Sequence, residues 1–414
     1  MNNEYFDLLL KMKDKSPEPM SLFCSKSNEG GIFTPFCLLD ENKVKAQPVF
    51  LYESLRDHNS EIFKGHDLRL IKMQAGLGSS VKRDDIIMKY DNRESLGSKG
   101  TDLFFPVGEN NFKSVVSLQV LQANYLKNYL PFSKVKLQFL VNEETSKQVA
   151  SCIDSLDTSI KKVMEPEISQ NMMPTISEAG ELTRERVAPA GHGFIGFREI
   201  YQALSSEADE IVCIGNGEDL NSTPDEKILA HVIKNEIPVV MITTTKTSAD
   251  LKGGQMGIRK EGEHEIISIF EKAQAEESGQ LEYFEKLGLR EQDGESFFNT
   301  NMAIINTKPL RDAFRGLDMS FEDFIEKIAP EVIKNVKIQD GKRFTQLESA
   351  LGSVLLNMNS FFIKKSGRNI LHLCNVGVEN RYRFFLPIKK REDYDFYLEK
   401  YKVTTPQYTL NPKG

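Results

Sequence analysis

The sequence predicts an α/β fold with a mostly parallel sheet that helices cover on both faces. Short apolar runs rich in branched residues alternate with longer segments of helical period, which is typical of parallel sheets. The predicted strands are residues 68–73, 135–141, 210–214, 238–243 and 302–306. The predicted helices are residues 114–130, 143–155, 199–204 and 225–235, with a later one at 344–359. Ligands of such sheets bind at the carboxyl ends of the strands.

The composition is that of an ordinary globular protein, with 40% hydrophobic and 27% charged residues. A net charge of −7 argues against nucleic acid or an anionic membrane as the main partner. No apolar run reaches the roughly 18–20 residues that span a bilayer, and the N-terminus lacks a secretory pattern. The 5 cysteines are odd in number and widely scattered, which favours a reducing cytoplasm over a disulfide framework.

The length of 414 residues predicts two domains, or one large α/β domain with additions. Prolines and glycines between short amphipathic pieces indicate a helical or irregular N-terminal extension over residues 1–65. Residues 66–390 carry the alternation of strands and helices and form the predicted core. Residues 384–389 are expected to form a domain-closing strand at the end of this core, and residues 391–414 are expected to form a short helix and a tail.

A glycine loop, Gln74-Ala75-Gly76-Leu77-Gly78, directly follows the predicted strand 68–73. Glycines in such a turn let backbone N–H groups approach a phosphate or a base where a Cβ would interfere. The loop lacks the Gly-Lys-Ser/Thr ending of a Walker A loop and the third glycine of a dinucleotide fingerprint. A phosphate-binding loop and a plain tight turn between strand and helix both remain open.

Two acidic residues follow the predicted strand 210–214, in Asn216-Gly217-Glu218-Asp219. Carboxylate oxygens are hard ligands suited to Mg²⁺, and phosphates would bind at the same edge of the sheet. Glu218 is the first candidate for a metal ligand, and Asp219 is the alternative. A pair of exposed turn acids without a metal is the other interpretation.

Four further motifs follow along the chain. They are Gly191-His192-Gly193, Asp250-Leu-Lys252-Gly-Gly254 after Lys246, Phe298-Asn299-Thr-Asn301 with Lys308 behind it, and the stretch from Gln346 to Gly352. Together with the glycine loop and the Asn216 motif, this order resembles the eukaryotic-type UTP–glucose-1-phosphate uridylyltransferases, also called UDP-glucose pyrophosphorylases. The resemblance covers about residues 65 to 400 and implies a Rossmann-like nucleotidyltransferase core.

The resemblance implies three groups of site residues. The nucleotide-binding group comprises Ala75, Gly76, Gly78, Gln170 and Gly191. The substrate-binding group comprises His192, Asn216, Asn299, Asn301 and Lys389. The catalytic lysines, which would neutralise phosphate charge, are Lys308, Lys252 and Lys99, and the Mg²⁺ ligand would be Glu218 or Asp219.

The match departs from the family pattern around the glycine loop. Ala75 stands at the first glycine of the family loop. In the family a Pro-Lys pair comes soon after the loop and its lysine grips the phosphates, whereas this chain has an insertion followed by Thr101-Asp102. Lys99, just before Asp102, is a candidate for the missing charge, and so are Lys82 and Lys89 within the insertion.

The resemblance implies a defined reaction. A sugar 1-phosphate attacks the α-phosphorus of UTP in line, so that a UDP-sugar forms and pyrophosphate leaves. Glucose 1-phosphate is the default substrate, because the motifs resemble the glucose branch most. The alternative is a degenerate member that binds UTP or a UDP-sugar without turnover, as a sensor or scaffold. The chain ends at Gly414, before the β-helix module through which the family often assembles, so we expect a monomer or weak oligomer.

Overall fold

The computed structural model describes residues 33–36, 44, 46–76, 78, 81, 83–90, 97–170, 172–247, 250, 254–271, 279, 282, 296–328, 333–339 and 341–414. The chain forms two compact units, each assembled from three separate segments. Unit 1 consists of Met1–Leu55, Met173–Ala208 and Glu236–Val378. Unit 2 consists of Arg56–Met172, Asp209–Asn235 and Glu379–Gly414.

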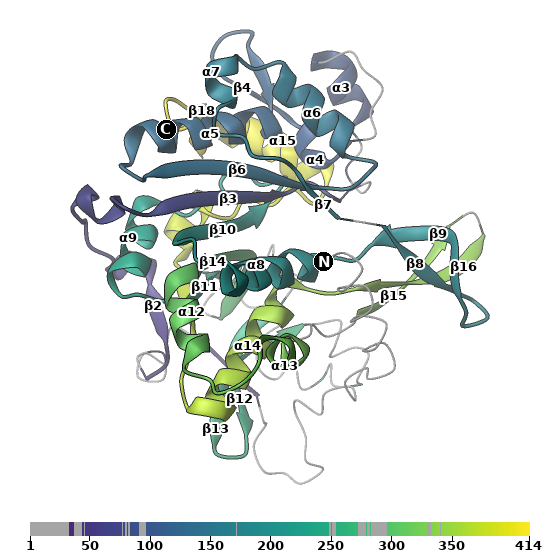
Figure 1. The fold of residues 1–414 in the computed structure, drawn as a ribbon. Coiled ribbons are helices and arrows are strands. Elements are labelled where there is room, and N and C mark those ends of the chain that lie inside the picture. Colours follow the sequence, from purple (N-terminus) through teal and green to yellow (C-terminus); the bar gives the residue numbers. More distant parts are fainter. Residues whose placement is uncertain are drawn as a thin grey trace. The chain divides into compact units, whose positions relative to one another are not determined.

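Unit 2 is built on a parallel sheet. Its strands are β10 (Glu210–Asn216), β3 (Asp67–Met73), β6 (Lys134–Val141) and β7 (Ile168–Ser169), in this spatial order. Every pairing between these neighbours is parallel, and β3, β6 and β10 run side by side in Figure 1. Nearly all residues of β3 and β10 are buried, as expected of strands that are covered on both faces.

Helices and two hairpins complete unit 2. The helices are α3 (Asp84–Tyr90), α4 (Lys99–Asp102), α5 (Val115–Tyr129), α6 (Ser146–Asp154), α7 (Thr158–Lys161), α9 (Glu226–Lys234) and α15 (Arg391–Lys400). The hairpins are β4 (Phe104–Pro106) with β5 (Phe112–Ser114), and β18 (Tyr401–Thr404) with β19 (Thr409–Pro412). Ser114 and Asp225 start α5 and α9 by accepting backbone N–H bonds in the first turn, which is the usual role of an N-cap.

Unit 1 contains a mixed sheet. Strands β2 (Val49–Leu51), β17 (Leu371–Val376) and β11 (Val239–Thr245) are parallel, and β14 (Phe297–Asn306) runs antiparallel to β11. Strands β1 (Phe33–Pro35), β12 (Gly254–Glu261) and β13 (His264–Glu271) extend it with antiparallel pairs. The mixed, mostly parallel sheet with flanking helices confirms the predicted fold class. Strands β1 and β2 lie within residues 1–65, for which the sequence predicts an extension.

Unit 1 also carries helices and a smaller sheet. The helices are α8 (Gly193–Ser205), α12 (Thr307–Arg315), α13 (Phe321–Lys327) and α14 (Leu351–Ser366), and α8 packs against α12 and α14. The smaller sheet has the order β15 (Ile333–Gln339), β16 (Lys342–Glu348), β8 (Met172–Ser177), β9 (Leu182–Pro189). The short 3-10 helices η1 (Tyr52–Ser54), η2 (Ser60–Phe63) and η3 (Val378–Arg383) connect other elements. Among the helices that the structure describes, none combines the length and apolarity needed to cross a bilayer.

Two predictions for the last part of the chain are wrong. Residues 344–348, expected to begin a packing helix, belong to strand β16, and the helix α14 begins only at Leu351. The reason is a hairpin turn at Gly341, where φ is +72°, which pairs β16 with β15 along its whole length. Residues 384–389, expected to form a domain-closing strand, form no strand. Pro387 in this segment has no N–H group to donate to a neighbouring strand.

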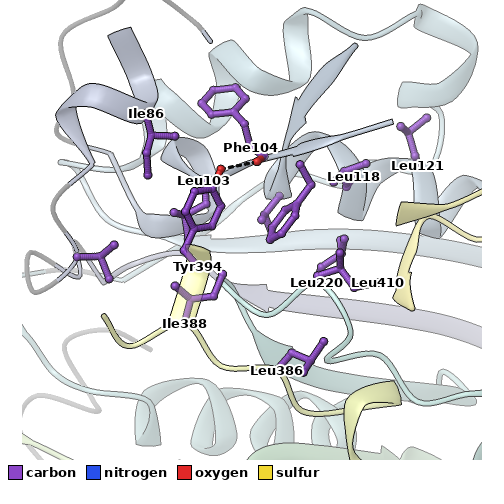
Figure 2. Close-up of a cluster of buried hydrophobic side chains, with 13 residues drawn as sticks. Ile86, Leu103, Phe104, Leu118, Leu121, Leu220, Leu386, Ile388, Tyr394 and Leu410 are labelled. Atoms are coloured by element: carbon purple, nitrogen blue, oxygen red, sulfur yellow. Dashed lines mark hydrogen bonds between the residues drawn. The ribbon is translucent and has the colours of Figure 1, made fainter. Parts of the chain in front are cut away.

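An apolar cluster joins the C-terminal segment to the rest of unit 2 (Figure 2). Its centre is Tyr394 on α15, whose ring is 1% exposed and makes an edge contact with Phe105. The Tyr394 hydroxyl donates a hydrogen bond of 2.6 Å to the Phe104 carbonyl, drawn dashed in Figure 2. Leu386, Ile388 and Leu410, from the same segment, belong to this cluster. Residues 379–414 are therefore part of the core of unit 2.

We predict that Tyr394→Ala lowers the free energy of unfolding by about 3–5 kcal/mol, the usual cost of deleting a buried aromatic ring. Tyr394→Phe, which removes only the hydrogen bond to Phe104, should cost about 1 kcal/mol. Phe396→Ala on the same helix is the control, since that ring is 49% exposed, and its effect should stay within about 0.5 kcal/mol. Urea denaturation followed by circular dichroism measures all three. Equal losses for Tyr394→Ala and Phe396→Ala would contradict the description of this core.

Candidate functional site

The carboxyl ends of four parallel strands meet at one edge of the sheet in unit 2. The register pairs Asn216 with Met73, Met73 with Leu140, and Leu140 with Ile168. The segments that follow these strands therefore begin side by side, because parallel neighbours end at the same edge. They carry the glycine loop, Gln170 and the acidic pair Glu218 and Asp219. The structure thus brings most of the residues predicted to bind the nucleotide and metal to one place.

The glycine loop is shaped by a left-handed residue and a crossing side chain. Gly78 has a φ of +56°, a conformation that residues with a Cβ rarely adopt. A methyl group at this position would lie 2.6 Å from Cγ of Lys99, because the Lys99 side chain runs directly across it. Asn142, at the end of β6, donates from Nδ2 to the Ala75 carbonyl at 2.7 Å. The loop is therefore held from two sides.

Lys99 links the glycine loop to the loop that follows β10. It is the first residue of α4, and its Nζ donates to the carbonyl of Ile388 at 2.7 Å. The same Nζ lies 3.4 Å from Oε1 of Glu218. The side chains of Lys99 and Glu218 are 14% and 28% exposed, so both reach solvent. Gly78, Lys99 and Glu218 form one group, which we call the Lys99 cluster.

The acidic pair divides into one partly exposed and one fully buried carboxylate. Asp219 accepts backbone N–H bonds from Asn221 at 3.0 Å and from Leu386 at 2.7 Å, one on each oxygen. Burial raises the pKa of Asp219 to about 7, although these two bonds and nearby Lys72 lower it. Both Asp219 oxygens thus hold the chain in place, whereas Glu218 is the carboxylate that faces outward beside Lys99.

Lys72 is a buried residue of this region that sequence reasoning missed. It lies on β3, is 2% exposed, and its Nζ donates to the carbonyl and hydroxyl of Ser222 at 2.5 and 3.1 Å. A third bond of 2.8 Å reaches the Thr223 hydroxyl. Burial lowers the pKa of Lys72 to about 8, while the charge of Asp219 acts in the opposite direction. A lysine between the apolar residues Ile71 and Met73 of a predicted strand was the signal in the sequence.

Asn221 is a second missed residue, and it ties the C-terminal segment to the loop after β10. Its Nδ2 donates to the carbonyls of Tyr382 and Leu410, both at 2.7 Å, and its Oδ1 accepts from Leu410 N at 2.8 Å. The side chain is 2% exposed. Together with the bond from Leu386 to Asp219, these contacts place Ile388 where its carbonyl accepts from Lys99.

Buried amides connect the glycine loop to the Gly217 backbone. Gln74 and Gln119 both donate from Nε2 to the Gly217 carbonyl, at 2.7 and 3.0 Å. Ser98, the N-cap residue of α4, donates to Oε1 of Gln74 at 2.5 Å. One polar network therefore spans the glycine loop, the start of α4 and the loop after β10.

Three further predicted residues of unit 2, Gln170, Asn216 and Lys389, lie at or near the same edge. Gln170 follows β7 and is buried, and its backbone N–H donates to the Val141 carbonyl at 2.8 Å. Asn216 ends β10, and its carbonyl accepts from the Ser222 hydroxyl at 2.8 Å. Lys389 is exposed and directly follows Ile388. Lys89 lies 4.9 Å from the Tyr90 ring centroid, and Lys82 lies outside the described residues.

In unit 1, His192 meets Asn301. Nδ1 of exposed His192 lies 2.8 Å from Nδ2 of Asn301. The register of β14 against β11 shifts between Asn299 and Met302, so that Asn301 lies in a β-bulge with a φ of +61°. Bulges of this kind re-aim a side chain next to functional sites. Asn299 Oδ1 accepts from Asn301 N at 3.0 Å, so three predicted substrate residues lie together.

Gly191 is required by close backbone packing. Its φ is +79°, and a methyl group there would lie 2.5 Å from the Ser349 carbonyl oxygen. Gly193 N donates to the same Ser349 carbonyl, and Ser349 N donates to the Ala190 carbonyl. The connection between β16 and α14 therefore fixes the backbone around His192, which immediately precedes α8.

Lys308 follows the end of β14 that lies away from Asn299. The strand runs antiparallel to β11, with Asn299 opposite Thr243 and Ile305 opposite Val239. Lys308 follows in the first turn of α12 and is exposed. At about 3.3 Å per residue, roughly 20 Å separates Asn299 from the end of the strand. The structure does not bring Lys308 to Asn299, because the extended strand between them carries the two residues apart.

The Asp250 motif is only partly described. Oδ2 of Asp250 accepts from the backbone N–H and the hydroxyl of Thr247, at 2.9 and 3.1 Å, which makes a compact turn after β11. Lys252 lies outside the described residues. Lys246 is 1% exposed at the end of β11. Within the described ranges, no three His, Cys, Asp or Glu side chains gather closely enough to hold a metal ion by themselves.

A comparison with known families identifies the chain's relatives. The model of the UTP–glucose-1-phosphate uridylyltransferase family matches residues 93–413, which is most of the chain. The chain belongs to this family. The predicted resemblance is therefore confirmed.

Individual family members are distant. The chain is 30% identical over 231 residues to the UTP–glucose-1-phosphate uridylyltransferase of Hordeum vulgare, covering 55% of this chain and 41% of that protein. It is 25% identical over 377 residues to UTP–glucose-1-phosphate uridylyltransferase 2 of Dictyostelium discoideum, covering 86% and 64%. The chain therefore spans less than two thirds of the length of these family members.

Solved structures of UDP-glucose pyrophosphorylases share the fold. A mutant of the Leishmania major enzyme in complex with UDP-glucose matches with a TM-score of 0.69 and 20% identity, covering 99% of this chain and 78% of that one. The Trypanosoma brucei protein matches with a TM-score of 0.61 and 18% identity, covering 90% and 76%. These likenesses confirm the α/β nucleotidyltransferase fold expected for the family.

We predict that Asp219 makes stability depend on pH. The folded pKa is raised from 3.8 to about 7, so between these values the folded state holds a proton that the unfolded state has released. The contribution of this carboxyl to the free energy of unfolding therefore falls as pH rises from about 4 to 7 and is constant above about 7. Asp219→Asn removes the effect. Urea denaturation across this range gives the free energy of unfolding of the wild-type protein minus that of Asp219→Asn. This value should fall as pH rises from about 4 to 7. A value that stays constant or rises with pH would contradict the assignment.

Proposed function

We propose that this chain is a uridylyltransferase that makes a UDP-sugar and pyrophosphate from UTP and a sugar 1-phosphate. Glucose 1-phosphate is the proposed sugar substrate, because the chain's family and relatives bear that name. The proposal rests on the family match together with the Lys99 cluster in unit 2. The attack on the α-phosphorus is in line, and little covalent chemistry is asked of the protein.

The Lys99 cluster carries the proposal. A triphosphate needs backbone N–H groups that it can approach closely and a cation that neutralises charge in the transition state. Gly76 offers open space, since a methyl group there would meet nothing within 4 Å, and Gly78 lies under Lys99. We therefore assign the triphosphate to the loop that contains Ala75, Gly76 and Gly78, with Lys99 as its positive charge.

Lys99, rather than Lys308, is the proposed catalytic lysine. Its Nζ is held beside Glu218 and the glycine loop by the Ile388 carbonyl. The end of β14, which Lys308 follows, lies roughly 20 Å from Asn299, and Lys308 is exposed in α12. The role of Lys252, which is not described, stays a prediction from the sequence.

Glu218 is the proposed Mg²⁺ ligand. Mg²⁺ is often bound by one or two carboxylates together with substrate phosphates and water, so a single outward carboxylate fits such a site. Asp219 fits less well, because both of its oxygens accept backbone N–H bonds. When bound, the metal would supply neutralisation of phosphate charge. Glu218 would hold it, and Lys99, whose Nζ lies 3.4 Å from Oε1 of Glu218, would bind the phosphates.

Residues from other elements would position the base and the sugar. We assign Gln170 to the uracil edge, because an amide donates and accepts at once. His192, Asn299 and Asn301 would bind the sugar phosphate and its hydroxyls, since they form one hydrogen-bonded group. Gly191 keeps the backbone near His192 in place. Asn216 and Lys389 stay candidates for substrate contact.

We further propose a cytoplasmic monomer or weak oligomer that binds no nucleic acid. The 5 cysteines are odd in number and widely scattered along the chain, which suits a reducing compartment. The net charge of −7 argues against nucleic acid. Light scattering of the purified protein tests the oligomeric state.

We predict that the protein releases pyrophosphate only when UTP, Mg²⁺ and a sugar 1-phosphate are all present. Addition of EDTA should abolish release. Lys99→Ala should lower kcat by about 100-fold or more, the typical cost of removing one preorganised transition-state contact. Lys308→Ala, which removes an exposed lysine, is the matched control and should leave kcat near the wild-type value.

Two results would change the proposal. If Lys308→Ala loses as much activity as Lys99→Ala, Lys308 contributes the charge that the sequence motif suggests. If folded wild-type protein binds UTP but stays silent with every sugar 1-phosphate in a panel, the chain is a nucleotide-binding protein without turnover.

A further inference from the structure

Asp102 occupies the position where the resemblance expects the phosphate-gripping lysine, yet it points away from solvent. Its side chain is fully buried at the end of α4. Oδ2 accepts from Nε of Arg83 at 3.0 Å, and Oδ1 accepts from the Thr101 hydroxyl at 3.2 Å. A buried carboxylate that is paired with an opposite charge has a structural role, and it does not contact the UTP triphosphate.

Arg83 uses its other donors on the backbone around the glycine loop. Nη1 donates to the Gly78 carbonyl at 2.7 Å, and Nη2 donates to the Gly97 carbonyl at 3.2 Å. The side chain is 6% exposed. One guanidinium group therefore joins the loop after β3, the segment before α4, and α4 itself. Its planar fork suits such a three-way contact better than the single ammonium of a lysine does.

The bond from Arg83 to the Gly78 carbonyl connects the Arg83–Asp102 pair to the Lys99 cluster. Lys99 and Asp102 stand at the two ends of α4, one turn apart. The Lys99 side chain crosses Gly78 on one side, while Arg83 holds the carbonyl of the same residue. A shift of the Arg83–Asp102 pair would therefore move both the loop backbone and the helix that carries Lys99.

We propose that Arg83 and Asp102 are positioning residues that fix the glycine loop and Lys99 for binding the UTP triphosphate. The proposal rests on the function proposed above. In this chain Lys99 supplies the positive charge for the phosphates. Asp102, which stands at the position of the family lysine, anchors Arg83 instead. Asp102→Lys, which restores the family residue, would place a second positive charge beside buried Arg83 and should weaken UTP binding.

The test measures UTP affinity by isothermal titration calorimetry, which needs no turnover, on Arg83→Gln, Arg83→Lys, Asp102→Asn and Asp102→Lys. The matched control is Arg69→Gln. Arg69 lies near the start of β3, pairs with Glu210 at 3.1 Å, and donates to Gln138, away from the loop. Melting temperatures of all variants are recorded first, and binding is measured well below them.

We expect Arg83→Gln to raise the Kd for UTP by about tenfold or more, since small displacements of a binding group have effects of this size. Arg83→Lys should recover part of the affinity because it keeps the charge. Arg69→Gln should lower the melting temperature while leaving the Kd near the wild-type value. Equal changes in Kd for Arg83→Gln and Arg69→Gln, or tighter UTP binding by Asp102→Lys, would overturn the proposal.

A second measurement separates this proposal from the proposed function. Hydrogen–deuterium exchange of peptides covering residues 74–78 reports the loop without any ligand. Faster exchange in Arg83→Gln and Asp102→Asn, but not in Arg69→Gln, supports the positioning role even if wild-type protein fails to bind UTP. That failure would refute the function, whereas unchanged exchange in the loop would refute the positioning role.

Discussion

The crossing of the Lys99 side chain over Gly78 is the constraint on which the proposed phosphate site depends. A residue with a Cβ at position 78 would collide with that side chain and would also resist the left-handed backbone. The crossing brings Lys99 to Glu218 and to the loop, although the three residues are far apart in the sequence. The glycine thus serves the approach of a side chain as well as the approach of a phosphate.

Buried polar groups hold this arrangement in place. Lys72, Asp219 and Asn221 each make two or three hydrogen bonds inside unit 2, and together they fix the loop after β10. A buried polar group without a partner costs far more than a formed hydrogen bond contributes, so such a network tolerates few alternative conformations. The C-terminal segment takes part twice, through these bonds and through the apolar cluster around Tyr394. It therefore supports the site although it is last in the chain.

Much of the fold follows from the sequence because buried parallel strands have a strong apolar signal. Strands β3, β6 and β10 and the glycine loop at their carboxyl edge were predicted on that basis. Pairing between distant segments was not predictable from local pattern. The antiparallel direction of β14 depends on its neighbours, and so does the bulge at Asn301. The hairpin that makes residues 344–348 a strand, and the partners of Lys72 and Asn221, likewise appear only when the fold brings distant residues together.

The most direct measurement is the calorimetric Kd for UTP in the presence of Mg²⁺, compared between wild-type protein and Gly78→Ala. The substitution adds one methyl group under Lys99 and leaves every charged group unchanged. We expect UTP to bind the wild-type protein and its affinity to fall by about tenfold or more in Gly78→Ala, as the loop and Lys99 move apart. Gly76→Ala is the control, because a methyl group there meets nothing within 4 Å. Wild-type affinity in Gly78→Ala would contradict the account.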